Sequence, residues 1–229
     1  MSLMTLAAIC AAALAGGKPA PAGTDCAAIA RQYQVAITQV APLLAAPDSR
    51  DAVARVAYAE AGNQGDSGLA GVVYTIVNRL MDGGWGNGVS SVLNAPGQFE
   101  PVTRAGGWEH LPARSAVERA HIDTIINLAL DGRLPDPTNG ARFFQNPTIV
   151  AKRAGEGSVS AGLLNFGGQT PVAVIKDHAF YDKGVAPSPA ARAAPPLFVP
   201  VQSGGRADGA VSTAGDASQP TSLFVPLNH

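Results

Sequence analysis

The sequence predicts a mainly α-helical domain with small β elements, an α+β fold, followed by a C-terminal tail of different composition. Apolar residues recur three and four positions apart in several segments of residues 48–183, as on one face of an α-helix. Strand-like runs there are short, at 141–145 and 172–176. Residues 184–229 are rich in Ala, Pro, Gly and Ser, and bury too little surface to offset their chain entropy. We therefore expect one folded domain over 48–183 and a flexible tail over 184–229.

The composition argues against several classes of protein. Lysine and arginine number 16 against 17 acidic residues, so there is no basic excess to bind nucleic acid. The two cysteines are too few for a disulfide framework or a four-thiolate zinc site. No apolar run is long enough to predict a membrane-spanning helix. The histidines lack metal-ligand spacing and no nucleotide-binding motif occurs, so we expect no metal and no other cofactor.

Residues 1–16 are apolar and end in Ala13-Leu14-Ala15, which resembles a short secretory signal with an A-x-A cleavage site. No basic residue precedes this stretch, so an Ala-rich helix that packs against another element is the alternative. The sequence leaves both interpretations open. Residues 17–47 form a leader in which a Pro-rich spacer precedes a short helix over 26–44. We expect the prolines near its end to terminate that helix.

Three longer helices are predicted inside the domain. They run from Arg50 to Ala61, from Asp66 or Ser67 to about Leu80, and from about Pro112 to Leu130. Ser49 is the expected cap of the first, and Asp66 or Ser67 of the second, because short polar side chains accept from free N–H groups at a helix start. The second helix carries the most continuous apolar stripe, so we expect it in the core.

The tail contains a repeat of four residues. Leu197-Phe198-Val199-Pro200 recurs as Leu223-Phe224-Val225-Pro226. Two interpretations stay open: a pair of short motifs, around Phe198 and Phe224, that dock onto a partner protein, or accidental duplication in a low-complexity segment.

Glu60 is the first candidate for a catalytic residue. Val53, Val56, Ala57 and Glu60 stand at positions 0, 3, 4 and 7, which places the carboxyl on the apolar face of its helix. Burial and the C-terminal end of the helix dipole both raise the pKa of such a carboxyl, which then keeps a proton and can act as a general acid. A lone glutamate near a helix end more often keeps its head group in water. Spacing alone leaves both interpretations open.

Four short blocks of sequence give Glu60 a context. They are Tyr58-Ala59-Glu60-Ala61-Gly62-Asn63-Gln64-Gly65 followed by Asn78-Arg79, Gln98-Phe99-Glu100-Pro101-Val102, Ala141-Arg142-Phe143-Phe144-Gln145-Asn146-Pro147, and Asp177-His178-Ala179-Phe180-Tyr181. In these blocks and their order, between Asp51 and Asp182, the chain resembles the SleB-type cell wall hydrolases. That family comprises spore-cortex-lytic enzymes and their phage and proteobacterial relatives.

The resemblance implies a lysozyme-like, mostly helical domain that cuts the glycan strands of peptidoglycan. It implies that Glu60 protonates the glycosidic oxygen between N-acetylmuramic acid and N-acetylglucosamine. It further implies a lytic transglycosylase or muramidase mechanism. In the first of these, the deprotonated Glu60 acts as a base on the C6 hydroxyl of the muramoyl residue, and a 1,6-anhydro product forms.

A second catalytic carboxyl is expected in ordinary retaining and inverting glycosidases, where two acids flank the scissile bond. The nearest acids are Asp66, which has an expected role as a helix cap, and Glu100. In the family that the chain resembles, some members have serine at the position of Glu100. The Arg-Gly-Glu of the spore enzymes is Gly62-Asn63-Gln64 here, which removes another carboxylate. We therefore favour a single catalytic glutamate.

The other blocks supply candidate contacts to the sugar. The expected substrate-binding residues are Gln98, Phe99, Glu100, Phe144, Gln145, Asn146, His178 and Tyr181. The amides carry donors and acceptors suited to acetamido and hydroxyl groups, but an Asn followed by Pro can instead organise a turn. The phenylalanines either stack on sugar rings or fill the core. The histidine bonds Glu60, bonds the substrate, or supports the fold.

Three functional hypotheses follow from the sequence. The first is a peptidoglycan-cleaving enzyme, periplasmic, secreted or carried by a phage-like particle. The second is a non-catalytic structural or adaptor component of such a particle with a lysozyme-like fold. The third is cleavage of the amide bond between glycan and peptide, which usually needs zinc or a Cys/His pair, and neither is evident.

Overall fold

The computed structural model describes residues 3–182, which are mostly helical and contain one small antiparallel sheet, as the sequence predicts. The helices are α1 (Leu3–Leu14), α2 (Cys26–Ala45), α3 (Pro47–Ala61), α4 (Gly65–Asp82), α5 (Val89–Leu93), α6 (Glu100–Ala105), α7 (Ala116–Leu130), α8 (Pro147–Gly155) and α9 (Asn165–Gly168), with 3₁₀ turns η1 (Trp108–His110) and η2 (Ala161–Leu163). The strands are β1 (Phe143–Gln145), β2 (Ala173–Ile175) and β3 (His178–Tyr181). The two copies of the Leu-Phe-Val-Pro repeat, around Phe198 and Phe224, lie outside the described residues.

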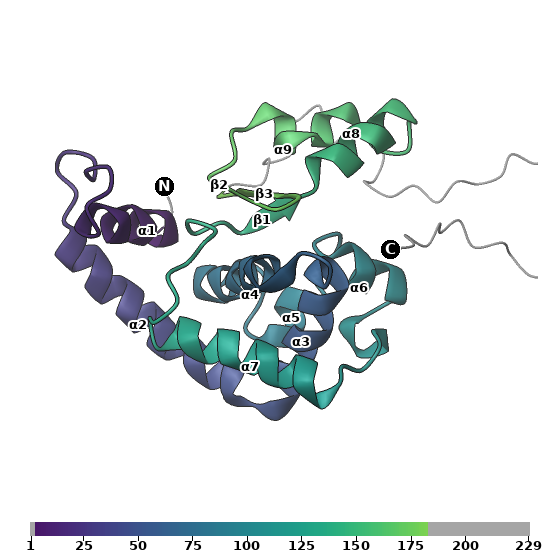
Figure 1. The fold of residues 1–229 in the computed structure, drawn as a ribbon, viewed down its shortest axis with the longest axis horizontal. Helices are drawn as coiled ribbons and strands as arrows, with labels where there is room; N and C mark the ends of the chain where they lie inside the picture. The colour runs from purple at the N-terminus through teal and green to yellow at the C-terminus, as the bar shows by residue number, and fades with distance from the viewer. Residues whose placement is uncertain (1–2, 183–229) are drawn as a thin grey trace, which may run out of the picture. The chain divides into compact units, whose positions relative to one another are not determined.

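Helix α4 forms the centre of the helical part. Every residue from 68 to 80 is buried, because α2, α3, α5 and α7 all pack against this helix (Figure 1). A helix that is apolar on nearly all sides is stable only when it is covered in this way. The central position of α4 fixes the last turns of α3 and α4, which carry Glu60 and Arg79.

Helices α2 and α3 differ from the prediction at prolines. Helix α2 continues past Pro42 to Ala45, so that proline does not end it. Helix α3 starts at Pro47, three residues before its predicted start. Proline suits the first helical position, because the N–H that it lacks would have no partner there. Ser49 lies inside the helix, and its prediction as a cap is therefore wrong.

The cap of α4 and the start of α7, predicted at about Pro112, also differ from the prediction. Helix α4 starts at Gly65 without a side-chain cap, so Asp66 and Ser67 lie within its first turn. Helix α7 starts at Ala116 because Ser115 and Glu118 form a capping box. The Ser115 hydroxyl accepts from the Glu118 N–H at 3.2 Å, and the Glu118 carboxylate accepts from the Ser115 N–H at 2.8 Å.

The sheet has the order β1-β3-β2, with both pairs antiparallel. Phe144 pairs with Phe180, and Val174 pairs with Ala179. Strands β1 and β2 lie within the two predicted runs. The central strand β3 was not predicted, and all four of its residues are buried. A two-residue turn, Lys176-Asp177, connects β2 to β3. Lys176 has a φ of 52°, in the left-handed region.

The sheet packs against α4 through a close contact. A Cβ atom at Gly71 of α4 would lie 2.7 Å from Cζ of Phe180 and 3.3 Å from Cδ1 of Ile175. Phe180 is fully buried, so its ring has little room to move away. Only glycine therefore fits at this point of the helix without a shift of the sheet.

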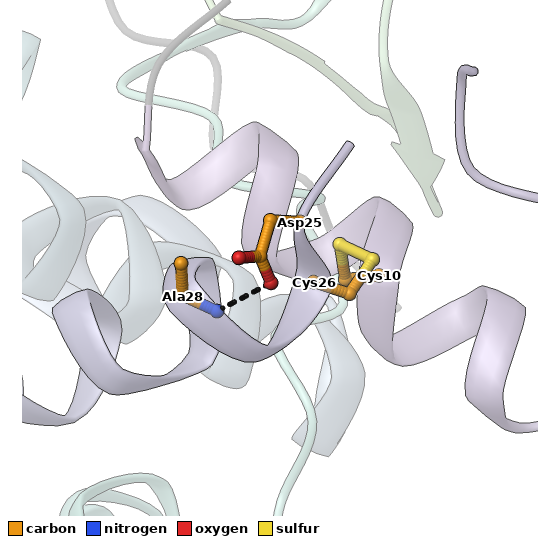
Figure 2. Close-up of a disulfide and its surroundings, with 4 residues drawn as sticks. All are labelled: Cys10, Asp25, Cys26 and Ala28. Atoms are coloured by element: carbon orange, nitrogen blue, oxygen red, sulfur yellow. Dashed lines mark hydrogen bonds between the residues drawn. A yellow bond between two sulfur atoms is a disulfide. The ribbon is translucent and has the colours of Figure 1, made fainter. Parts of the chain in front are cut away.

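The N-terminal apolar segment forms helix α1, which packs against α2. A disulfide bond between Cys10 and Cys26 joins the two helices (Figure 2). Next to it, the Asp25 carboxylate caps α2 by accepting from the Ala28 N–H at 2.9 Å. Within residues 3–182, none of the helices has the length and apolar character needed to cross a bilayer.

Candidate active site

Glu60 lies in the last turn of α3, on the face that the spacing predicts. Val53, Val56 and Ala57, which share this face, are completely buried. The Oε1 atom of Glu60 is also shielded from solvent and has no hydrogen-bond partner among the described residues. The backbone N–H of Glu100 donates to the carboxyl. The side chain as a whole is partly buried, so one carboxyl oxygen lies in the interior while the residue keeps some access to solvent.

Burial is the main cause of an altered acidity at Glu60. It raises the pKa from 4.5 to about 7, and the negative charge of Glu100 acts in the same direction. The positive charge of Arg79 and the hydrogen bond from the Glu100 backbone oppose this rise. At neutral pH a large fraction of Glu60 therefore carries the proton that a general acid must donate.

Arg79 is the buried cation of the site. Its Nε donates to the carbonyl of Arg142 at 2.7 Å and its Nη2 donates to Oε1 of Gln98 at 3.0 Å, while Nη1 has no partner. The guanidinium lies within 6 Å of the ring centres of Trp85, Phe99 and Phe143. Burial lowers the pKa of Arg79 to about 9, and the charge of Glu60 partly offsets this effect.

Glu100 is the second carboxyl of the site and has the opposite acidity. Arg153 donates to its two oxygens at 2.8 and 3.0 Å, and Arg104 also donates to Oε1. These bonds and charges outweigh the effect of burial and hold the pKa of Glu100 below its ordinary value. Glu100 is therefore ionised under conditions where Glu60 keeps its proton. Such a separation of two neighbouring carboxyl groups is typical of sites of acid catalysis.

A comparison with known protein families identifies the family of this chain. The family model described as Cell Wall Hydrolase matches residues 63–181, just over half of the chain. The chain belongs to the cell wall hydrolase family. No curated protein and no solved structure matches it. The matched range contains the blocks around Gln98, Phe144 and His178, and it begins three residues after Glu60. The family confirms the resemblance and supports a hydrolase that acts on peptidoglycan. The catalytic role of Glu60 and the lysozyme-like architecture stay predictions.

In this cell wall hydrolase, two of the predicted contact residues next to the acid have structural partners. The side-chain amide oxygen of Gln98 accepts from Arg79, and the Gln98 side chain is partly buried. Phe99 is fully buried, and its ring centre lies 4.7 Å from the Arg79 guanidinium carbon. Phe99 thus has no surface for a sugar ring in this conformation, whereas Gln98 retains some exposure.

Gln145 and Tyr181 both hold the segment that starts α9. The Gln145 amide donates to the Leu163 carbonyl at 3.1 Å and accepts from the Asn165 N–H at 3.0 Å. The Tyr181 hydroxyl donates to Oδ1 of Asn165 at 2.7 Å. Both side chains are buried, so they position this segment rather than expose groups to a ligand. Asn165 and Phe166 have φ values of 50° and 46°, a strained conformation that these contacts maintain.

Asn146 is the N-cap of α8. Its Oδ1 accepts from the N–H groups of Thr148 and Ile149 at 3.0 and 3.1 Å. Pro147 follows as the first residue of the helix. The structure thus gives Asn146 the turn-organising role that the sequence left open.

His178 and Phe144 belong to one aromatic cluster. Their ring centres lie 5.1 Å apart, and Phe144 also contacts Phe99 and Phe180. Burial lowers the pKa of His178, with Asp177 opposing the effect, and its Nδ1 has no hydrogen-bond partner in the described chain. His178 is therefore neutral at pH 7. The partly buried Phe144 is the member of this cluster that the sequence proposed for sugar stacking.

A surface hollow of about 740 Å³ lies beyond the end of α3. Its lining residues are Asn63, Gln64, Gly65, Asp66, Ser67, Lys176 and Asp177. Gln64 bridges its two walls, because its amide donates to Asp177 at 3.0 Å and accepts from the Asp177 N–H at 3.2 Å. Glu60 is not part of the lining. The Asp66 side chain is highly exposed, and its Oδ1 lies 3.4 Å from Nε2 of His121. Asp66 therefore does not serve as a second buried acid.

Residues 3–182 contain no cluster of three or more His, Cys, Asp or Glu side chains arranged to hold a metal ion. The most informative residue that sequence reasoning did not select is Arg79. It stands in the Asn78-Arg79 motif. The feature of the sequence that could have identified it is a charged side chain within the apolar stripe of α4.

Proposed function

We propose that this cell wall hydrolase cleaves the glycan strand of peptidoglycan between N-acetylmuramic acid and N-acetylglucosamine, with Glu60 as the general acid. One observation carries the proposal. At the end of α3 the Glu60 side chain is partly buried, its Oε1 is shielded from solvent and unpaired, and its pKa is raised to about 7. A neutral carboxylic acid at neutral pH has a proton ready for the bridging oxygen of a glycosidic bond.

The first step transfers this proton. Glu60 donates it to the glycosidic oxygen as the bond from that oxygen to C1 of the muramoyl residue breaks, and the N-acetylglucosamine leaves with a free C4 hydroxyl. C1 becomes oxocarbenium-like and positively charged. The Glu60 carboxylate then takes a proton from the oxygen nucleophile that bonds to C1, which returns Glu60 to its starting state.

The nucleophile that we propose is the C6 hydroxyl of the same muramoyl residue. Glu100 is a poor covalent nucleophile, because both of its oxygens accept hydrogen bonds from arginine side chains. Asp66 is exposed and lies beside His121. With neither Glu100 nor Asp66 placed to attack, an internal hydroxyl yields a 1,6-anhydro end, as in a lytic transglycosylase. Attack by water would instead give a reducing end, as in a muramidase.

The predicted contact residues divide by their burial. Those that keep some exposure are Gln98, Glu100, Phe144 and Asn146. Those that are buried are Phe99, Gln145, His178 and Tyr181. We assign sugar contact to Gln98, Glu100 and Phe144 of the first group, and support of the site to the second group and to Asn146, which caps α8. An enzyme with this substrate acts in the periplasm or outside the cell.

Replacement of the acid tests the proposal. Glu60→Gln keeps the size of the side chain but has no proton to donate, so lysis of purified sacculi should fall by about 10²–10⁴-fold. Asp66→Asn, which removes the exposed acid of the neighbouring turn, should retain lysis. Mass spectrometry of the digest should detect anhydro-muramoyl ends. Wild-type lysis by Glu60→Gln would overturn the acid assignment, and reducing muramic acid ends would overturn the transglycosylase assignment alone.

A further inference from the structure

Arg79 is a buried charged residue that the mechanism above does not use. It is 1% exposed, although a guanidinium is among the most costly groups to remove from water. No carboxylate forms a salt bridge with it among the described residues. A cation in such surroundings needs another source of stabilisation, and its contacts show two.

The first source is aromatic. The guanidinium carbon lies 4.7 Å from the ring centre of Phe99, 5.2 Å from that of Trp85 and 5.7 Å from that of Phe143. The faces of aromatic rings attract cations, and this attraction is strongest where water is absent. These rings hold the guanidinium in the core without neutralising its charge.

The second source is the turn that precedes α6. Arg79 holds Gln98 by the 3.0 Å bond from Nη2 and packs on Phe99, the next residue. The residue after that is Glu100, whose backbone N–H donates to the Glu60 carboxyl. A single guanidinium thus contacts two consecutive residues, Gln98 and Phe99, and the residue that follows them interacts with the proposed acid through its backbone. Its Nε bond to the Arg142 carbonyl joins the same group to the start of β1.

Two buried polar atoms remain without partners near this turn, Oε1 of Glu60 and Nη1 of Arg79. Such atoms are rare in native structures and often mark a site where charge changes during function. When Glu60 gives up its proton, a negative charge appears on a carboxyl whose Oε1 is shielded from solvent. The fixed positive charge of Arg79 attracts that charge, and a preorganised group of this kind lowers the energy of the charged state without reorganisation.

We infer that Arg79 is a positioning residue for the acid: its guanidinium holds the Gln98–Glu100 turn against Glu60 and stabilises the carboxylate that remains after proton transfer. The inference rests on the proposed role of Glu60 and extends it to a residue that has no contact with the substrate. It also explains why a charged residue is retained in the apolar centre of α4.

The pH dependence of the reaction gives a readout that damage to the fold would not imitate. Two charged groups act on Glu60, Arg79 from α4 and Glu100 from α6, and Arg153 and Arg104 balance the charge of Glu100. Loss of the Arg79 charge removes the positive charge that favours the ionised form of Glu60, so Glu60 binds its proton more tightly. The pH at which activity falls on the alkaline side should then move upward, while the maximal rate decreases.

The test measures the rate of cleavage of soluble glycan strands between pH 4.5 and 9. Arg79→Met, which removes the charge, should lower kcat by about 10²-fold and move the alkaline limb to higher pH. Arg79→Lys keeps the charge but cannot form the bonds to Gln98 and to the Arg142 carbonyl together. Its kcat should therefore fall, while the alkaline side of its pH–activity profile stays near that of the wild type. Arg142→Met is the matched control, because it removes a nearby arginine whose side chain pairs with Asp82 and Asp182 instead. It should leave the limb unchanged.

Each outcome bears on the inference. Unchanged kcat and an unchanged limb in both Arg79 variants would overturn it. If Arg79→Met does not fold by circular dichroism, Arg79→Lys decides: a lowered kcat supports the inference, and a wild-type kcat contradicts it. A limb that moves equally in Arg142→Met would assign the effect to general loss of positive charge and would also overturn it. Retained activity in Glu60→Gln would overturn the proposed function itself, which separates the two failures.

Discussion

The ionisation of Glu60 should make the protein less stable at alkaline pH, and Glu60→Gln should remove this loss. The folded-state pKa of about 7 lies above the ordinary value of 4.5, so the fold prefers the protonated form. This preference contributes its full stability below pH 4.5, declines as the pH rises, and is lost above pH 7. The alkaline protein therefore carries a buried charge that it does not need for folding.

The size of the effect follows from the two pKa values. Between 4.5 and about 7, at 1.36 kcal/mol for each pH unit, the free energy of unfolding falls by about 3 kcal/mol. Glutamine has nearly the same shape and no ionisation, so it keeps the packing and avoids the loss. Relative to the wild type, Glu60→Gln should gain about 3 kcal/mol between pH 4.5 and pH 8.5.

Urea unfolding at a series of pH values measures this difference. Glu156→Gln, at an exposed position after α8, is the control and should follow the wild-type curve at every pH. The reasoning is refuted if the wild type and Glu60→Gln lose stability in parallel between pH 4.5 and 8.5. That result would mean that Glu60 is hydrated in solution, and the proposed acid would lose its physical basis.

Two further changes test the packing that holds the site. Gly71→Ala places a methyl group against the buried ring of Phe180 and should lower the free energy of unfolding by about 1–2 kcal/mol, because overpacking exceeds the gain in helix propensity. Gly155→Ala, with open space around it, should be neutral or slightly stabilising in the same urea assay, and equal stability of the two variants would contradict the close contact. Replacement of Cys10 and Cys26 by Ser should weaken the attachment of α1 by about 3 kcal/mol. Hydrogen exchange should then speed up in α1 and stay unchanged in α3 and α4, and equal exchange of α1 in both proteins would count against the disulfide.

The helix face on which Glu60 lies could be predicted from sequence because it depends on a local regularity. Spacings of three, four and seven residues place a side chain on one face of a helix whatever the rest of the fold does. The same regularity predicted the apolar stripe of α4. It did not predict the helix starts at Pro47 and Ala116, since several polar or proline residues compete there and tertiary contacts decide among them.

Features that depend on long-range contacts were missed. Strand β3 is buried on both faces, so the alternation that identifies a half-buried strand is absent from His178 to Tyr181. The four sequence blocks also do not distinguish residues placed to contact a ligand from residues that hold the site in position. Gln145 and Asn146 are adjacent amides, yet one fixes Asn165 and the other caps α8. Arg79 was passed over because its neighbours in the chain do not reveal the three rings around it.

The bond between Cys10 and Cys26 closes a covalent loop around Ala13-Leu14-Ala15, the segment with the features of a cleavage site. A peptidase that cut this loop after oxidation would leave a two-chain molecule, with α1 still attached through sulfur. Its two pieces would travel together on a non-reducing gel and separate only after addition of a thiol. Cutting before oxidation would instead release α1 and leave Cys26 as an unpaired thiol, so the order of the two events decides the covalent form of the mature enzyme.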